Sequence, residues 1–172
     1  MSRTALLTAA LAASSLAGLA AAQDQRPAQP AEPPAAAGEQ PEIEMADGEV
    51  VFRDPLTNEV LDVPEEDVTE AVEEFHQTGM NPYTGDDAAA AEGKELYGSI
   101  CAACHLPDAT GRIGPNLVDD TVKYPRVAND VGMFEVIYAG AAGAMQPFAD
   151  RFSQDEMLKI MGYLAQLQQA QQ

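Results

Sequence analysis

The chain has 172 residues, with 28 acidic against 9 basic side chains, two cysteines, no tryptophan and a formal net charge of -19. This length allows one modest domain with tails, and so large an excess of carboxylates argues against unassisted binding of nucleic acid or anionic lipid. The 46% hydrophobic content overstates the core, because 31 residues are alanine and five are phenylalanine, so a large apolar filler would help the chain to fold.

Residues 1–22 have the pattern of a secretory signal peptide. Arg3 precedes an alanine- and leucine-rich run, Leu6 to Leu19, which ends in three small residues at Ala22. The run is too short and too interrupted by serine to form the membrane-spanning helix of about 20 residues. We therefore expect export to the periplasm, cleavage near Ala22 and no membrane span.

Residues 23–48 are rich in proline, alanine and glutamine, and such a segment buries too little apolar surface to offset the entropy of ordering it. It is predicted to be a disordered leader, with a tethering role as the alternative. An acidic extension, residues 49–87, follows. Its turn-forming segment Pro55–Asn58 is flanked by apolar residues, which predicts a small hairpin or extended pair; these residues are Val50, Phe52, Val60, Leu61 and Val63.

The extension continues with a helical pattern that ends near Gly79. Apolar residues recur at positions i, i+3, i+4 and i+7, as in an amphipathic helix: Val68, Ala71, Val72 and Phe75. His76 is expected at the surface of this helix. Residues 42–74 hold 13 acidic side chains and one basic one, Arg53. This charge is either a solvated face or a docking surface for a basic partner.

The chemistry of the chain centres on Cys101-Ala102-Ala103-Cys104-His105. Two cysteines in an exported protein can form a disulfide, and a cysteine pair can bind zinc. A zinc site needs further Cys or His ligands, and the only other histidine is His76. Cys-x-x-Cys-His is instead the attachment signature of c-type haem: the two thiols form thioethers, and the imidazole is the proximal iron ligand.

Two helices are predicted around this motif. The first begins near Asp87 and carries Gly93, Tyr97 and Cys101 on one face, where the glycine permits close approach of a second helix. The second follows a capping box at Ser153–Glu156 and has an apolar stripe formed by Met157, Ile160, Met161, Leu164 and Leu167.

These features resemble a class I cytochrome c, an all-α fold in which the first and last helices cross beside one covalent haem. Gly93 and Tyr97 match the family's positions on the first helix, and Ile160 and Tyr163 match those on the last. The family's Gly-Pro-Asn-Leu loop is matched by residues 114–117. The resemblance implies a cytochrome c domain over residues 88–172, in which the Pro115 carbonyl accepts a hydrogen bond from His105 and so fixes its ring.

The sixth iron ligand is expected to be a methionine. Met145 lies in the small-residue loop Gly140–Phe148 before the last helix, which is where class I cytochromes place this ligand. Met133 and Met80 are the alternatives, although Met133 is expected to pack in the core of a short helix and Met80 lies outside the class I order. The other candidates are assigned to the leader (Met45) or to the core stripe (Met157, Met161). A filled His/Met pair carries electrons rather than activating a substrate, so we expect no enzyme activity.

Three segments narrow the resemblance to the cytochrome cL family. They are residues 69–83, residues 123–134 and the stretch from the Gly140 loop to Leu158. The acidic N-terminal extension is the specific part of this likeness. Two departures are Gly79-Met80-Asn81 in place of Gly-Glu-Asn and the short end after the last helix.

The resemblance implies an electron carrier with one covalent haem c, which accepts electrons from a PQQ-dependent methanol dehydrogenase and passes them to a small cytochrome c. The acidic extension would attract a basic surface of the dehydrogenase, and this attraction should weaken with salt. Two alternatives remain open. One is a carrier in methylamine oxidation that accepts electrons from a cupredoxin, and the other is a haem sensor or enzyme with an open sixth site.

Overall fold

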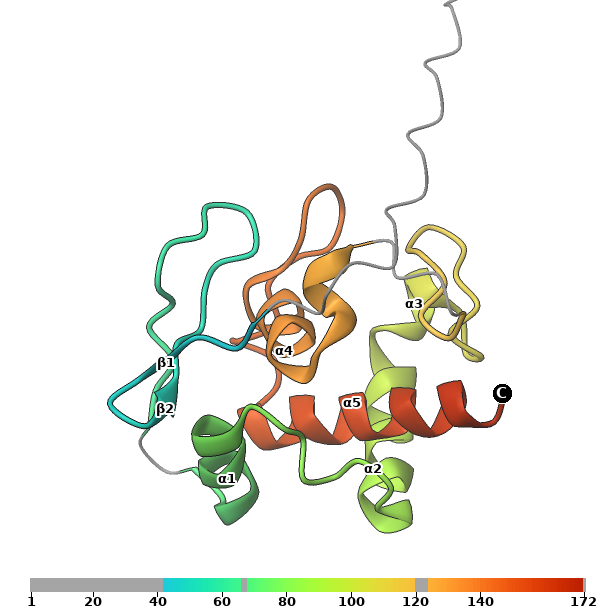
Figure 1. Ribbon diagram of the computed structural model, residues 1–172. Helices are drawn as coiled ribbons and strands as arrows, with labels where there is room; N and C mark the ends of the chain where they lie inside the picture. Colours follow the sequence, from blue (N-terminus) through green and yellow to red (C-terminus); the bar gives the residue numbers. More distant parts are fainter. Residues whose placement is uncertain (1–41, 66–67, 120–123, 172) are drawn as a thin grey trace, which may run out of the picture. The chain divides into compact units, whose positions relative to one another are not determined.

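The computed structural model describes residues 42–65, 68–119 and 124–171, which all belong to one unit, residues 34–172 (Figure 1). The predicted signal peptide, most of the predicted leader and Lys123 lie outside the described residues. None of the helices in the described part of the chain combines the length and the apolar character that a membrane span needs. The described residues are mostly helical, and their elements are β1 (Met45–Ala46), β2 (Glu49–Val50), α1 (Glu70–Thr78), α2 (Asp87–Ser99), α3 (Ala102–His105), the 3-10 helix η1 (Pro125–Ala128), α4 (Asp130–Ala139) and α5 (Gln154–Gln169).

The described extension starts with an antiparallel hairpin of two very short strands, β1 and β2, in which Met45 pairs with Val50. Asp47 and Gly48 connect the strands with φ angles of 53° and 92°, as an Asp-Gly hairpin turn requires. Met45 was expected in the leader, because the apolar pattern used to predict pairing begins only at Val50. The folded part of the extension therefore begins earlier than residue 49.

The extended pair predicted around Pro55–Asn58 is confirmed, although it is limited to one bridge, Arg53 with Val60. Two backbone hydrogen bonds close it: Leu61 donates to the Phe52 carbonyl at 2.9 Å, and the Asp54 N–H donates to the Glu59 carbonyl at 2.8 Å. The pair places Phe52 in the core, where its side chain is buried.

The amphipathic helix predicted in the extension is α1. Thr69 caps its start, Gly79 ends it with a φ of 70°, and Val72 and Phe75 are buried. The surface position predicted for His76 is wrong. Its side chain is 7% exposed, because its ring packs edge-on against Phe52 with centroids 5.1 Å apart.

The predicted crossing of the first and last helices of the cytochrome c domain is confirmed in α2 and α5 (Figure 1). A methyl group on Gly93 would overlap the backbone carbonyl of Lys159, so only glycine allows this approach. The rings of Tyr97 and Tyr163 lie 5.5 Å apart beside the crossing. The capping box predicted at the start of α5 is also present.

The extension packs on α4 through aromatic side chains and one buried carboxylate. The rings of Phe52, Phe75 and Phe134 lie 5.1–5.8 Å from one another. Beside them Glu135, only 3% exposed, accepts a hydrogen bond from the Arg53 backbone N–H at 2.6 Å and one from the Arg126 guanidinium at 2.5 Å. Side chains from three separate parts of the chain therefore meet on α4.

Candidate functional site

The two cysteines lie one helical turn apart. Cys101 has helical dihedral angles and caps α3, which contains Cys104 and ends with His105. The prediction that α2 continues to Cys101 is wrong, because α2 ends at Ser99 and its capping residue, Ile100, leaves the helical region with φ -135°. The motif therefore occupies a separate turn after α2.

Both thiols are free and half-buried, so the disulfide alternative is not formed. Burial raises the pKa of the Cys101 thiol to about 11, and the neighbouring Cys104 adds to this shift. A thiol with so high a pKa is protonated at neutral pH and is a poor nucleophile. Among the described residues no three His, Cys, Asp or Glu side chains could jointly hold a metal ion, which also argues against a zinc centre.

The imidazole of His105 is oriented by the Pro115 carbonyl, as expected, at 3.0 Å from Nδ1. A carbonyl oxygen only accepts hydrogen bonds, so Nδ1 is the protonated ring nitrogen. This tautomer leaves the lone pair on Nε2, the atom that an iron ion would require. The ring is 8% exposed.

The loop after α3 is folded tightly around His105. The Cys104 carbonyl accepts hydrogen bonds from three backbone N–H groups, those of Arg112, Ile113 and Gly114, at 3.1–3.2 Å. A methyl group on Gly114 would lie 2.7 Å from both ring nitrogens of His105, so this position requires glycine. The Gly-Pro pair thus supplies both a hydrogen-bond acceptor and the space for the ring.

Tyrosine hydroxyl groups join this loop to the crossing helices. Tyr97 on α2 donates to the Leu106 carbonyl at 2.8 Å, and Tyr163 on α5 donates to the Pro107 carbonyl at 3.4 Å. Leu106 has a φ of 66°, an uncommon value for a residue other than glycine. These two contacts hold the loop at the end of α2, and sequence reasoning missed them because it assigned both tyrosines only to the crossing.

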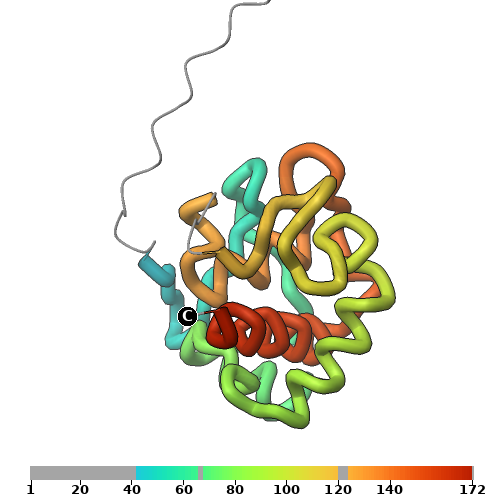
Figure 2. Tube along the Cα trace, turned by 90° about the vertical axis from the view of Figure 1, so that its right-hand side faces the viewer, coloured from blue at the N-terminus to red at the C-terminus, as the bar shows by residue number. Residues whose placement is uncertain are grey.

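Met145 lies in the loop between α4 and α5, and its half-buried side chain packs against the core. Gly140, with a φ of 85°, starts this loop, and the Ala141 N–H donates to the Met145 carbonyl at 3.1 Å. Figures 1 and 2 show this loop and the loop after α3 on the same side of α5. The structure thus brings Cys101, Cys104, His105 and Pro115 together, and it places Met145 on a second loop.

The other methionines are distributed as their surroundings dictate. Met80 is 64% exposed, and Met133 packs against the core from α4, as expected. Met157 and Met161 are buried in α5, which confirms their assignment to the core. Met45 is 45% exposed on β1.

The residues of this site fit a covalently attached haem c. The site provides two free thiols one helical turn apart, Cys101 and Cys104, and the imidazole of His105, whose Nδ1 is hydrogen-bonded to the Pro115 carbonyl. Gly114 leaves the space that the ring needs. A thioether from the loop between α4 and α5 would complete the axial pair.

Comparisons with known proteins agree with this arrangement. Residues 88–164 match the family model described as cytochrome c oxidase, cbb3-type, subunit III. A curated relative, cytochrome c-L of Methylorubrum extorquens, is 38% identical over 122 residues, which are 69% of this chain and 62% of the relative. The chain therefore spans less than two thirds of that relative's length.

Two crystal structures are also similar. Cytochrome cL from the marine methylotrophic bacterium Methylophaga aminisulfidivorans is 44% identical, with a TM-score of 0.63, over 66% of this chain and 78% of that one. Cytochrome cL from Hyphomicrobium denitrificans is 37% identical, with a TM-score of 0.64, over 67% of this chain and 72% of that one.

Proposed function

Because the chain belongs to the cytochrome cL family of c-type cytochromes, we propose that it carries single electrons from a PQQ-dependent methanol dehydrogenase to a small cytochrome c in the periplasm. The observation that carries this proposal is the extent of the match. The stretch matched to the Methylorubrum relative is 122 residues long, which is more than residues 88–172 contain, so the likeness includes part of the acidic extension. A match confined to the Cys-x-x-Cys-His domain would support a c-type cytochrome of any kind.

We assign the haem attachment to Cys101 and Cys104 and the proximal ligand to His105. When bound, the haem supplies a one-electron couple that needs no open coordination position. Pro115 keeps the Nδ1 proton of His105 in place, which presents the Nε2 lone pair and raises its basicity. Gly114 leaves room for the ring, and Tyr97 holds the loop that carries both.

Met145 is the proposed sixth ligand. Its loop is closed at Gly140, where a methyl group would lie 2.8 Å from the Met145 carbonyl, so this close approach requires glycine. A thioether ligand favours ferrous iron and raises the reduction potential, which suits an acceptor of electrons from a dehydrogenase.

A carbon monoxide assay tests this ligand. We expect Met145→Ala to let the ferrous protein bind carbon monoxide at neutral pH, whereas Met133→Leu, a control on α4, leaves the spectrum unchanged. Binding of carbon monoxide by the unsubstituted ferrous protein would contradict the assignment and would favour a sensor or enzyme with an open site.

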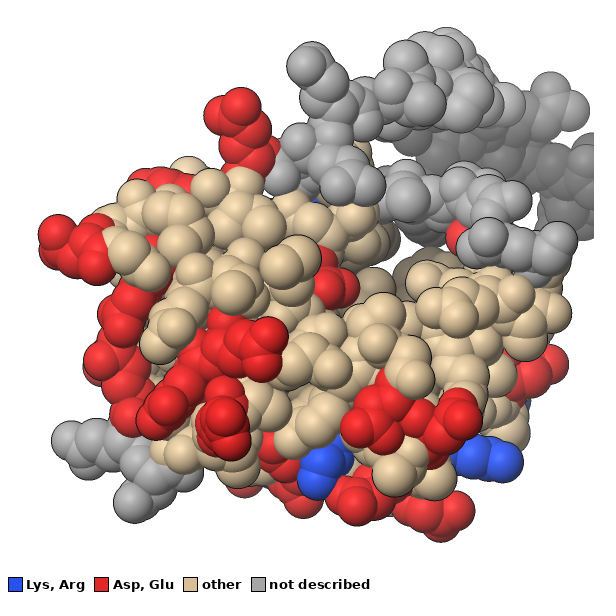
Figure 3. All heavy atoms as spheres, turned by 60° about the horizontal axis from the view of Figure 1, so that its bottom comes forward, with Lys and Arg blue, Asp and Glu red and all other residues tan. Residues whose placement is uncertain are grey.

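The acidic extension is proposed to attract the dehydrogenase through a basic surface of that enzyme. Acidic side chains form several groups on the face drawn in Figure 3, with few basic groups among them. Arg53 is the one basic residue of the segment 42–74. Its guanidinium group is neutralised by a bidentate ion pair with the Glu44 carboxylate, with N–O distances of 2.7 and 2.8 Å. Long-range attraction of this kind raises association rates and is screened over about 8 Å at physiological salt.

Stopped-flow absorbance tests the donor. Ferric protein matured in a periplasm is mixed with methanol dehydrogenase and methanol at several salt concentrations. We expect a ferrous c-type band to appear rapidly, with a bimolecular rate that falls as salt rises. A normal c-type spectrum without reduction would reject this donor and favour the cupredoxin-linked alternative. A rate independent of salt would contradict the electrostatic attraction alone.

A further inference from the structure

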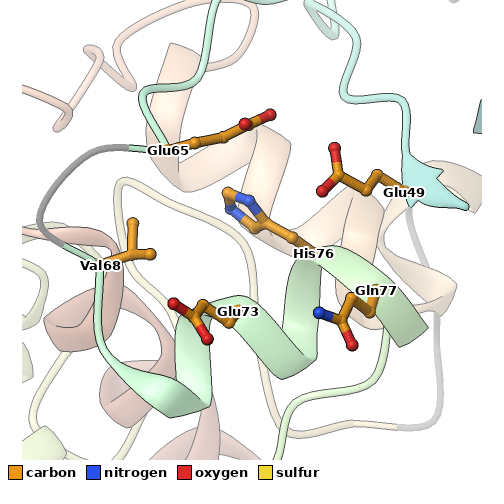
Figure 4. A pocket seen from close by; sticks show the side chains of 6 residues that line it. All are labelled: Glu49, Glu65, Val68, Glu73, His76 and Gln77. Atoms are coloured by element: carbon orange, nitrogen blue, oxygen red, sulfur yellow. The ribbon is translucent and has the colours of Figure 1, made fainter. Parts of the chain in front are cut away.

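Glutamine side chains tie both ends of α5 to other segments of the chain. In the first turn, the Gln154 side-chain oxygen lies 2.7 Å from Nε2 of His76, whose ring is drawn in Figure 4. In the last turn, the Gln168 side-chain N–H donates to the Leu117 carbonyl at 2.9 Å, across 51 residues of sequence. The first contact belongs to the extension, whereas the second reaches the loop around His105.

Leu117 fixes the second half of this loop. Its N–H donates to the Ala109 carbonyl at 2.9 Å, and its carbonyl accepts the bond from Gln168. The next residue, Val118, is 4% exposed, and its N–H donates to the Asn116 side-chain oxygen at 2.9 Å. Gln168 is half-buried, so solvent weakens its hydrogen bond less than it would on an open surface. The turn over residues 116–118 is therefore tied both to its own loop and to the last turn of α5.

This turn directly follows the group that orients His105. The Pro115 carbonyl lies 3.0 Å from Nδ1 of the imidazole. The proline ring fixes φ at about -65°, so the backbone has little freedom to absorb a shift of its neighbours. Gly111 packs against the same peptide unit, where a methyl group would lie 2.6 Å from both the Pro115 carbonyl carbon and the Asn116 nitrogen. A displacement of Leu117 is therefore passed on to the Pro115 carbonyl.

The bond from His105 Nδ1 to the Pro115 carbonyl controls how basic the imidazole is. A strong bond at Nδ1 makes the Nε2 lone pair more basic, and a more basic ligand favours ferric over ferrous iron. A weaker bond has the opposite effect and raises the reduction potential. Any group that holds this carbonyl in place thus influences the potential without touching the ring.

We propose that Gln168 is a positioning residue for the proximal ligand. Its hydrogen bond to the Leu117 carbonyl holds the Pro115 carbonyl against His105 Nδ1 and so keeps the reduction potential below the value that the loop alone would give. The inference rests on the part of the proposed function that makes His105 the proximal ligand. It does not depend on which protein donates the electron.

The test compares two substitutions on the same helix. Gln168→Met keeps a long unbranched side chain of similar helix propensity and removes the N–H donor. Gln166→Met is the matched control, because Gln166 is exposed and donates at 2.9 Å to the carboxylate of Asp87, outside this loop. Spectroelectrochemical titration of the haem-loaded proteins measures the potential. We expect Gln168→Met to favour the ferrous form about threefold, a rise of about 28 mV at about 59 mV per tenfold change, and the control to stay unchanged.

Proton NMR of the ferrous proteins examines the hydrogen bond itself. The Nδ1 proton of His105 should move upfield in Gln168→Met and exchange faster with water, because its acceptor has receded. Neither change is expected in Gln166→Met. A purely structural contribution of Gln168 would lower the free energy of unfolding and leave both the potential and this proton signal unchanged.

Several results would overturn the proposal. An unchanged or lowered potential in Gln168→Met, an unchanged Nδ1 proton signal, or equal shifts in the two variants would each do so. If the unsubstituted ferrous protein lacked the strongly shifted ring signals of an iron-bound His105, the ligand assignment would fail together with the inference. Neither measurement uses a dehydrogenase. The expected shifts in a protein that methanol dehydrogenase does not reduce would therefore reject the donor and keep the role of Gln168.

Discussion

At the crossing of α2 and α5 two backbones touch, because Gly93 leaves no side chain between its helix and the Lys159 carbonyl. The extension meets α4 differently, through the ring faces of Phe52 and Phe134 and through the buried carboxylate of Glu135. The first contact tolerates no added atom, whereas the second depends on side chains that can be altered one at a time. The haem-binding part is therefore expected to fail abruptly on substitution, and the extension to weaken in steps.

The largest effect is expected for Gly93→Ala. The added methyl group would overlap a backbone carbonyl, which cannot rotate away, and overpacking of this kind costs about 3 kcal/mol. Urea unfolding of the ferric protein, followed by far-ultraviolet circular dichroism, measures this loss. The matched control is Gly98→Ala on the same helix. No atom lies within 4 Å of a methyl group there, and the higher helix propensity of alanine should stabilise the protein by about 0.5–1 kcal/mol. Equal effects of the two substitutions would contradict the backbone contact.

Glu135→Gln is expected to cost about 2 kcal/mol, because the Arg126 guanidinium and the Arg53 N–H lose a charged acceptor. The cost is below that of a fully buried pair, since the Arg126 side chain keeps 31% exposure. Glu92→Gln breaks an ion pair in which the carboxylate is 63% exposed and should cost less than about 0.5 kcal/mol. The costs of the two substitutions are compared by measuring the unfolding free energy of each variant at two salt concentrations. A larger cost for Glu92→Gln would refute the view that Glu135 anchors the extension.

The structural features that could be predicted from the sequence are those determined by residues close together in the chain. The end of α1 at Gly79 and the capping box before α5 each follow from a short motif, whereas the contact of Pro115 with His105 was implied by the resemblance to class I cytochromes c. The glycine and tyrosine spacing also predicted the crossing, because both helices have one strongly patterned face. Such signals are local, so they survive without knowledge of the rest of the fold.

Burial of His76 could not be predicted, because it depends on a ring from the extension and on Gln154, 78 residues away. The role of Glu135 is hidden for the same reason, since its partner Arg53 lies 82 residues earlier. The break between α2 and α3 was also missed, because the spacing of four to Cys101 continues a helical pattern that the backbone leaves at Ile100. In each case a tertiary contact or a backbone turn overrides the local pattern.

Asp155 couples the two regions and makes their connection dependent on pH. Burial raises the pKa of its carboxyl group, but hydrogen bonds from Tyr83, Thr69 and Lys159 outweigh this effect and lower it. A carboxyl group with a lowered pKa in the folded state stabilises the protein above its unfolded pKa, and this stabilisation is lost as the pH falls through the folded value. Asp155→Asn should therefore cost about 1.5 kcal/mol at pH 7 and much less near pH 2–3.

Unfolding free energies between pH 7 and pH 2 test this coupling. Asp150→Asn, a substitution of an exposed carboxylate in the preceding turn, serves as the control and should leave the pH profile unchanged. A cost for Asp155→Asn that stays constant across this range would mean that packing, and not the charge, explains its contribution.

The smallest expected effects come from removing one tyrosine hydroxyl group beside the His105 loop and one in the contact with the extension. Tyr97→Phe removes a hydroxyl group that donates to the Leu106 carbonyl at 2.8 Å. Leu106 has a positive φ and directly follows His105. Tyr138→Phe removes a hydroxyl group that donates to the Asp62 carbonyl at 3.3 Å, at the exposed edge of the extension. We expect costs of about 1 kcal/mol and less than about 0.5 kcal/mol, because a short hydrogen bond to a sheltered carbonyl leaves an unpaired acceptor when it is lost. Urea unfolding resolves this difference, and a greater loss from Tyr138→Phe would show that the extension is held as rigidly as the loop around His105.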